Sequence, residues 1–361
     1  MENADGASYA NAGSITFDAT GNCKGGNSVT GEEIDLINSR TYKNPWKTGI
    51  AVKGADGKEI SLREVTIDIP GNGTPIEIFQ ISDVHFNSFY KGEADFVEAS
   101  YTEWGGKFGD NADIITAFKR CMNYAAGADR VILTGDLVNF YSRANYDTVE
   151  KYVFQAAENI NAALSGKVIP TAGNHECTYP DRSSLEQFDL NYNELKALYK
   201  KYGFDLDYTS QVIDRRVMVV VLDNASRYDA GGDRYSQAQV DNLTRDIAIA
   251  RENGYTMLLF GHIPMPTKNT DGNGYFRNYD PDAYTDSHPT AKAFFELVTN
   301  NADVIRGIFT GHFHEDNYVE IVAKTADGKP AYIPQYVLAN MRRLDGKVNT
   351  GDGMMTRIIL K

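Results

Sequence analysis

The sequence IEIFQISDVH (residues 76–85) is an apolar run that ends directly in an aspartate and a histidine. Its first six residues predict a strand, and Asp83 and His85 follow at the point where that strand ends. Other apolar runs end in similar polar motifs, namely Gly135-Asp136, Gly173-Asn174-His175-Glu176, Gly261-His262 and Gly311-His312-Phe313-His314. In open α/β sheets, binding sites lie beyond the carboxyl ends of the strands. The placement of the motifs therefore predicts one site that is assembled from several strand ends.

Segments with helical spacing separate most of these strands, which predicts an α/β fold. The expected helices cover residues 113–125, 146–164, 184–202, 236–251 and 290–298. A β-branched run at residues 217–222 predicts a fully buried strand. The last part of the chain predicts closing antiparallel strands at residues 318–322, 332–337 and 356–360.

Two aromatic-rich segments, residues 86–111 and 263–287, interrupt this pattern and are expected to be long loops. Loops of such length in a compact domain usually act as lids or binding walls, with plain surface covering as the alternative. Their aromatic side chains suggest that an organic leaving group could be held by stacking.

The chain shows no linker after residue 75, so we expect residues 76–361 to form one domain that carries every motif. Residues 1–75 are expected to be a polar, partly flexible N-terminal segment with a leading strand over residues 62–69. The Gly-, Asn- and Ser-rich beginning favours an exported or cell-surface protein after removal of a signal. A cytoplasmic protein with a flexible N-terminus is the alternative.

The net charge, the length of the apolar runs and the cysteine content of the chain limit what it can bind and where it can lie. The 361 residues carry a formal net charge of −13, which disfavours nucleic acid as the main partner, because phosphate backbones attract basic surfaces. No run approaches the roughly 18 apolar residues that a membrane span requires. The three cysteines form no C-x-x-C pair, so the sequence predicts neither a disulfide framework nor a structural zinc site.

Five of the six histidines lie in the strand-end motifs, beside aspartate, asparagine or glycine. A single such histidine would more often be a core or surface residue, but five together favour a metal site. Imidazole and carboxylate suit Zn, Mn and Fe. Asp136 is the natural bridge between two ions, because it lies on a tight glycine turn among the other motifs. Asp83 and His85, two residues apart, would face the same way in an extended segment.

The ordered motifs D-x-H, G-D, G-N-H-E, G-H and G-H-x-H resemble those of the calcineurin-like metallophosphoesterase superfamily over residues 75–361. The resemblance implies a four-layer αββα sandwich with mixed sheets. It also implies two divalent or trivalent metal ions (Mn, Fe or Zn) that share Asp136. One ion would take Asp83, His85 and His314, and the other would take Asn174, His262 and His312.

The resemblance sets His175 apart as a catalytic residue. In such sites a hydroxide that bridges the metals attacks phosphorus, and His175 would donate a proton to the leaving oxygen or stabilise the phosphoryl charge. Glu176 is expected to hold the backbone or a ligand histidine in place.

Asn139 departs from two branches of the family. Protein serine/threonine phosphatases have an aspartate at this position, and purple acid phosphatases have a tyrosine ligand there. Asn139 can accept a hydrogen bond from His175 but contributes neither charge nor phenolate. Both branches are therefore disfavoured.

The sequence thus predicts a metal-dependent phosphomonoesterase or phosphodiesterase that acts on a small-molecule ester. The first alternative is a non-catalytic metal-binding scaffold of the same fold, which would be expected to have lost some of the motif residues. A nuclease is less favoured, because the chain is acidic and has no basic tract.

Overall fold

The computed structural model describes residues 46–71, 73–93, 95–178, 185–226, 234–265, 288–342, 344 and 353–361, and three short strands before them. Those strands are β1 (Ser8–Ala10), β2 (Thr16–Phe17) and β3 (Cys23–Lys24). Within the part of the chain that is described, no helix is long and apolar enough to cross a membrane.

Two mixed sheets form the centre of the molecule. The six-stranded sheet has the order β4-β5-β15-β6-β7-β8. Its strands are β4 (Lys47–Lys53), β5 (Glu59–Ile67), β6 (Ile76–Ile81), β7 (Arg130–Thr134), β8 (Val168–Thr171) and β15 (Met354–Leu360). Strands β6, β7 and β8 run parallel, so their carboxyl ends meet at one edge of the sheet.

The seven-stranded sheet has the order β1-β13-β14-β12-β11-β10-β9. Its longer strands are β9 (Tyr208–Ile213), β10 (Val217–Leu222), β11 (Thr256–Phe260), β12 (Ile305–Thr310), β13 (Asn317–Lys324) and β14 (Pro330–Val337). Strands β10, β11 and β12 are parallel to one another.

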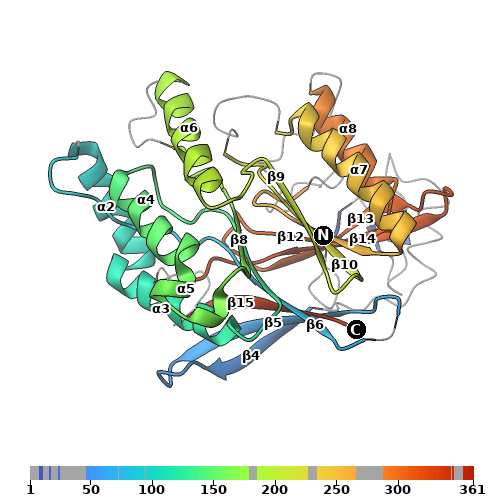
Figure 1. The fold of residues 1–361 in the computed structure, drawn as a ribbon, viewed down its shortest axis with the longest axis horizontal. Helices are drawn as coiled ribbons and strands as arrows, with labels where there is room; N and C mark the ends of the chain where they lie inside the picture. The colour runs from blue at the N-terminus through green and yellow to red at the C-terminus, as the bar shows by residue number, and fades with distance from the viewer. Residues whose placement is uncertain are drawn as a thin grey trace.

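Helices cover the outer face of each sheet (Figure 1). On one side lie α2 (Asp95–Phe108), α3 (Asn111–Ala125), α4 (Arg143–Val149) and α5 (Ala156–Asn159). On the other side lie α7 (Gln237–Asn253) and α8 (Pro289–Thr299). Helix α6 (Leu185–Lys201) packs above the first group. The expected four-layer αββα sandwich with mixed sheets is therefore confirmed.

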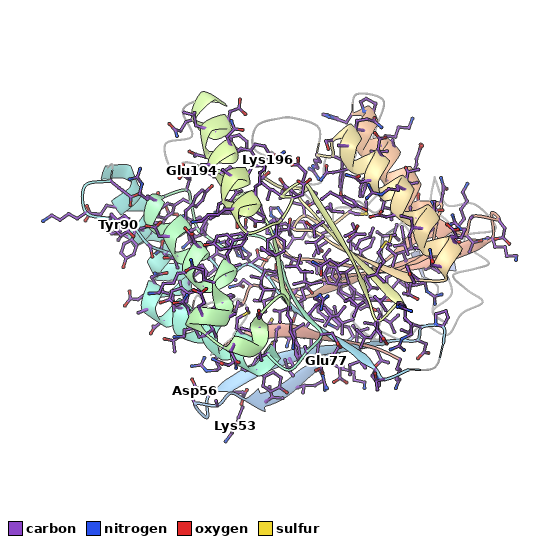
Figure 2. All side chains as sticks on the ribbon, in the orientation of Figure 1. Lys53, Asp56, Glu77, Tyr90, Glu194 and Lys196 are labelled. Atoms are coloured by element: carbon purple, nitrogen blue, oxygen red, sulfur yellow. The ribbon has the colours of Figure 1, made fainter. Side chains whose placement is uncertain are left out.

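The side chains of β10 point alternately to its two faces, and this alternation shows why the layers form. Val217, Val219 and Val221 belong to the apolar core between the two sheets, whereas Met218 and Val220 belong to the core beneath α7 and α8. Both faces of this strand are buried, as the continuous β-branched run predicts. Side chains fill the space between the layers, while the labelled charged residues Lys53 and Asp56 lie at the outside (Figure 2).

Several expectations from the sequence need correction. Residues 86–111 are not one long loop, because α2 occupies residues 95–108. The segment 146–164 is broken by a π-helical turn at Glu150–Phe154 and a 3₁₀ turn at Ala162–Leu164. The final strand, β15, lies in the other sheet from β13 and β14, parallel to β5 and antiparallel to β6.

The N-terminal region contributes strands to both sheets. Strand β5 lies directly beside β15, and β4 pairs antiparallel with β5. Strand β1 pairs parallel with β13. The division of the chain at residues 75 and 76 stays a prediction. Most of the second aromatic segment, residues 266–287, lies outside the described residues.

Candidate metal centre

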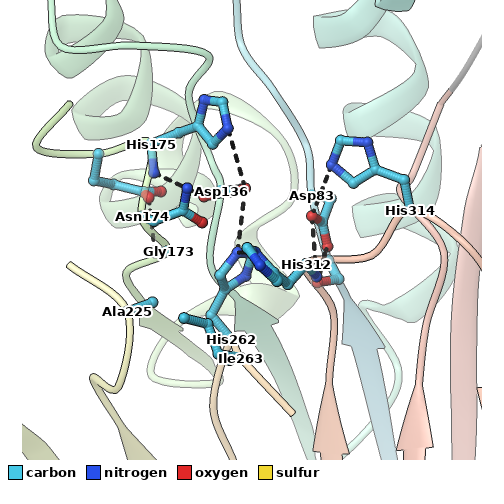
Figure 3. Close-up of polar contacts among 12 residues, drawn as sticks. Asp83, Asp136, Gly173, Asn174, His175, Ala225, His262, Ile263, His312 and His314 are labelled. Atoms are coloured by element: carbon cyan, nitrogen blue, oxygen red, sulfur yellow. Dashed lines mark hydrogen bonds and ion pairs between the residues drawn. The ribbon is translucent and has the colours of Figure 1, made fainter. Parts of the chain in front are cut away.

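The five strand-end motifs meet at one place between the carboxyl ends of the two sheets. The loops after β6, β7 and β8 come from one sheet, and the loops after β11 and β12 come from the other. Figure 3 shows their side chains converging on Asp136, with His175 on one side and Asp83 and His314 on the other. Parallel strands within each sheet, and the packing of the two sheets, bring motifs together that are up to 231 residues apart in the sequence (Asp83 to His314).

One group of donors gathers around His85. Its Nε2 lies 2.9 Å from Nε2 of His314, 3.9 Å from Oδ1 of Asp83 and 3.9 Å from Oδ2 of Asp136. The Nε2 of His314 lies 3.2 Å from Oδ1 of Asp83. One donor atom from each of these four residues lies within 4.8 Å of all the others. Such spacing allows a single cation to contact all four side chains.

A second group of donors shares Asp136 with the first. Its Oδ2 lies 3.2 Å from Nε2 of His262, which in turn lies 3.2 Å from Nδ1 of His312. The amide oxygen of Asn174 is buried and has no hydrogen-bond partner among the described residues. Of the residues in the two groups, only Asp136 belongs to both.

The backbone at the donors adopts an unfavourable conformation. Among the described residues, seven that are not glycine have positive φ, and five of these are donors. They are Asp83 (51°), His85 (56°), Asp136 (48°), His312 (77°) and His314 (58°). Each left-handed residue costs about 1–2 kcal/mol and persists only where the surroundings impose it. The extended backbone expected at Asp83-Val84-His85 is therefore wrong, although both side chains still reach the cluster.

Hydrogen bonds between the motif loops impose this conformation. The backbone nitrogens of Asp83 and His85 donate to the carbonyls of Gly135 (3.1 Å) and Asp136 (2.9 Å). The backbone nitrogen of His312 donates to the Asp83 carboxylate at 3.1 Å. Each loop therefore holds the next one in place.

At two of the motif glycines, a side chain would collide with a neighbouring donor. A Cβ on Gly173 would lie 2.1 Å from Oδ1 of Asp136. A Cβ on Gly311 would lie 2.2 Å from Oδ2 of Asp83. These glycines let the two carboxylates approach the backbone of the neighbouring loops.

Burial and neighbouring charges shift the pKa values of the clustered side chains. Burial lowers the pKa of His262, but the Asp136 carboxylate more than offsets this effect and raises that pKa to about 10. Burial raises the pKa of Asp83, but the hydrogen bond from His314 and the charge of His262 bring it down to about 2. Burial and the charge of His262 together lower the pKa of His312 to about 3. A cation that binds here therefore competes with a proton on His262.

His175 lies at the edge of the cluster, with 18% of its side chain exposed, whereas the His85 and His262 side chains are fully buried. Its Nε2 lies 3.8 Å from Oδ2 of Asp136. Its backbone nitrogen donates to Oδ1 of Asp136 at 3.0 Å, so the same carboxylate orients the loop that carries it. Solvent can thus reach this imidazole beside a buried anion.

Asn139 accepts a hydrogen bond from His175 through its main chain. Nδ1 of His175 lies 2.6 Å from the Asn139 carbonyl oxygen. The Asn139 side-chain amide instead donates to the carbonyl of His85 at 3.2 Å. Orientation of His175 therefore does not depend on the charge of the side chain at position 139.

Glu176 is buried and fastens two motif loops together. Its carboxylate accepts hydrogen bonds from the backbone nitrogens of Leu137 (2.5 Å) and Gly173 (2.7 Å). Burial and the nearby charge of Asp136 raise the pKa of Glu176 to about 8. Of the two roles that the sequence suggested for Glu176, holding the backbone or holding a ligand histidine, these hydrogen bonds correspond to the first.

Helix α2 adds Trp104 and Phe108 to the site, and the sequence, which placed an aromatic-rich binding wall here, did not predict their contacts with the histidines. Phe108 stacks on His85, with ring centroids 4.3 Å apart, and Trp104 lies perpendicular to His175 at 5.2 Å. The signal was present in the sequence, since Tyr101, Trp104 and Phe108 recur at the three- and four-residue spacing of a helix.

The donor set fits a pair of metal ions. It combines imidazoles, carboxylates and one buried amide oxygen that has no hydrogen-bond partner among the described residues. Such oxygen and nitrogen donors suit Zn, Mn and Fe, and a carboxylate shared between two positions suits a dinuclear site.

Comparison with known proteins agrees with this geometry. Residues 76–316 match the family model of the calcineurin-like phosphoesterases. No curated protein matches the chain.

Similar solved structures include a dimetal phosphatase from Danio rerio, with 12% identity and a TM-score of 0.43 over 73% of this chain and 87% of that one. PhoD shares 13% identity, with a TM-score of 0.45 over 79% of this chain and 60% of its own. A putative 5′-nucleotidase from Staphylococcus aureus shares 11% identity, with a TM-score of 0.34 over 74% of this chain and 55% of its own. This chain spans less than two thirds of the last two.

Proposed function

Because this chain belongs to the calcineurin-like phosphoesterase family, a family of metal-dependent phosphoester hydrolases, we propose that it hydrolyses small-molecule phosphate esters at the Asp136 cluster. The observation that carries this proposal is the sharing of one buried carboxylate by two sets of donors. A dinuclear site needs such a bridge to screen two like charges. We propose Mn, Fe or Zn as the ions, on the basis of the donor types.

The assignment of donors follows the two groups. One ion position would be formed by Asp83, His85 and His314, the other by Asn174, His262 and His312, and Asp136 would contact both. When bound, a pair of ions polarises a phosphoryl oxygen and lowers the pKa of water, which supplies a nucleophile near neutral pH. The chain supports this chemistry because its donors lie on a strained backbone that hydrogen bonds between the motif loops hold in place.

His175 is proposed to give a proton to the leaving oxygen. The Asn139 carbonyl can only accept a hydrogen bond, so Nδ1 of His175 carries a hydrogen. Nε2, which faces Asp136, is then the atom that exchanges a proton with the substrate. The partial exposure of the ring allows an ester oxygen to reach it.

A non-catalytic scaffold is the second candidate, and it predicts metal binding without turnover. We disfavour it because the sequence has lost no motif residue and because six of the proposed donors lie close together. We disfavour a nuclease because the net charge is −13. The substrate is proposed to be a phosphate monoester or diester of small size.

Removal of metal is expected to abolish hydrolysis, and addition of Mn, Zn or Fe is expected to restore it. The test uses the chelator-treated protein, a panel of aryl and alkyl phosphate mono- and diesters, and measurement of bound metal by elemental analysis. Two bound ions with no hydrolysis of any ester would favour the scaffold. Full activity without metal would contradict the proposal.

Iron-loaded protein is expected to show no strong visible absorption from tyrosinate. Asn139 stands where purple acid phosphatases carry their tyrosine ligand, and its side-chain nitrogen bonds the His85 carbonyl. A visible spectrum of concentrated protein with a measured iron content tests this expectation. An intense band that disappears on reduction would show that a phenolate from elsewhere in the chain binds iron.

A further inference from the structure

Among the described residues, none gives His85 the hydrogen bond that usually orients a metal-binding histidine. Its Nε2 faces the donor cluster, so Nδ1 is the nitrogen that should be fixed by a hydrogen bond. This Nδ1 is buried and has no hydrogen-bond partner among the described residues. Histidine ligands normally donate this N–H to a carbonyl or carboxylate, which fixes the plane of the ring.

His262 shows the usual arrangement in the same site. Its Nδ1 lies 2.8 Å from the carbonyl oxygen of Thr134, while its Nε2 faces Asp136. These two histidines of the cluster are therefore oriented in different ways. A hydrogen bond orients His262, whereas packing against neighbouring rings orients His85.

Of the described rings around His85, that of Phe108, the last residue of α2, stacks on it at 4.3 Å, and the ring of Trp104 lies parallel to it farther away, at 6.0 Å. The rings of Phe108 and His85 are nearly parallel, with an interplanar angle of 6°. The edge of the same phenylalanine packs against His314, at 5.5 Å and 76°. Phe108 is 1% exposed, so it cannot move aside into solvent. One aromatic side chain thus contacts two donors of the same proposed ion position.

Trp104 extends this aromatic surface toward His175. Its ring is parallel to Phe108 at 5.7 Å and perpendicular to His175 at 5.2 Å. Parallel and edge-to-face ring contacts have preferred geometries, so they restrict rotation of a partner ring. Helix α2 thus contacts the histidines of the site through two rings, and the Asn87 side chain, close to His85, donates a hydrogen bond to its Tyr101 carbonyl at 2.8 Å.

We propose that Phe108 is a positioning residue, which sets the ring plane of His85 in place of a hydrogen bond and thereby tunes one of the two ion positions. This inference rests on the proposed dinuclear function. The affected position is the one formed by Asp83, His85 and His314. The other position keeps its own orienting contact, between His262 and the Thr134 carbonyl.

The test is a calorimetric titration of metal-free protein with Mn²⁺, comparing wild type with Phe108→Leu. We expect one of the two binding steps to weaken by roughly 10- to 100-fold, the range that follows loss of a contact that orients a ligand. The other step should stay unchanged. The same titration of His314→Ala identifies the step that belongs to the Phe108 position.

Phe118→Leu is the matched control. Phe118 is also a fully buried phenylalanine in the same apolar core, and its ring packs edge-to-face on Phe86, which is not a donor. The Phe118→Leu protein should be less stable than the wild type but should bind both Mn²⁺ ions with unchanged affinity. Phe108→Tyr retains the aromatic face and should restore the weakened step to within a few fold. If Phe108→Leu does not fold, Phe108→Met, whose flexible side chain adapts better to a gap in the core, replaces it.

Unchanged affinities in Phe108→Leu, or equal weakening in Phe118→Leu, would overturn the role of Phe108 and leave the dinuclear proposal intact. A wild-type protein that binds fewer than two ions would instead overturn the dinuclear proposal, and this inference with it.

Discussion

Asp136→Asn is expected to eliminate hydrolysis and to remove at least one metal ion from the protein. Asparagine keeps the shape of the side chain but loses the charge that two cations would share. A bound metal contributes several kcal/mol of transition-state stabilisation, so the loss in kcat/KM should be at least about 10³-fold. The experiment measures kcat/KM and metal content together for the wild type and the variant.

The surroundings of Asp136 explain why no neighbouring side chain can take over its proposed role as the bridge between two ions. Its Oδ2 lies near His85, His262 and His175, and its Oδ1 accepts the backbone N–H of His175. The only donor common to both groups is this carboxylate. In the metal-free protein the change should also lower the pKa of His262, because Asp136 is what raises it to about 10. Histidine NMR titrations of the metal-free variant would detect this shift.

Asp246→Asn provides the control for loss of a buried carboxylate. Asp246 is 2% exposed and accepts hydrogen bonds from Tyr208 and Arg245, away from the donor groups. It should change the melting temperature without changing metal content. An Asp136→Asn protein that retains two ions and near wild-type kcat would contradict the bridging role.

His175→Gln is expected to retain both metals and to lose about 10²- to 10⁴-fold in kcat, the usual contribution of a positioned acid or base. Metal retention follows from geometry, because His175 is not one of the clustered donors. The loss should be larger for alkyl esters than for aryl esters, because a poor leaving group depends more on a proton donor. Steady-state kinetics on both ester types, with metal analysis of each preparation, tests this prediction.

His288→Gln is the matched histidine control. His288 precedes α8 and makes no capping hydrogen bond with its side chain. It should leave kcat and metal content unchanged. Loss of metal in His175→Gln would reassign His175 as a ligand. An equal loss for alkyl and aryl esters would mean that it stabilises phosphoryl charge and does not protonate the leaving oxygen.

Much of the donor cluster could be anticipated from the sequence because its chemistry is local. A strand must end before a tight polar turn, and each motif places its aspartate or histidine within a few residues of that end. Parallel strands of one sheet end at the same edge, so the motifs within each sheet had to meet there, and the packing of the two sheets brings the two sets of motifs together. The same local reasoning located α3, α6, α7 and α8 to within a few residues.

Helix α2 shows where local reasoning failed. The long loop expected over residues 86–111 is wrong where α2 lies, and there Tyr101, Trp104 and Phe108 follow helical spacing. Glycines at positions 105 and 106 weaken the helical signal, since glycine disfavours helix interiors by about 1 kcal/mol. Packing of Phe108 against His85 and the core supplies what local propensity lacks.

The sequence by itself determined which side chains could bind metal, because donor chemistry belongs to individual side chains and each motif directly follows a strand. Only the tertiary structure decided how each donor is presented. It placed five donors at positive φ, turned Nδ1 of His312 toward the cluster where His85, His262 and His314 present Nε2, and gave His175 a main-chain partner at Asn139. These features depend on hydrogen bonds and ring contacts between segments far apart in the chain, and no local pattern of residues encodes such contacts.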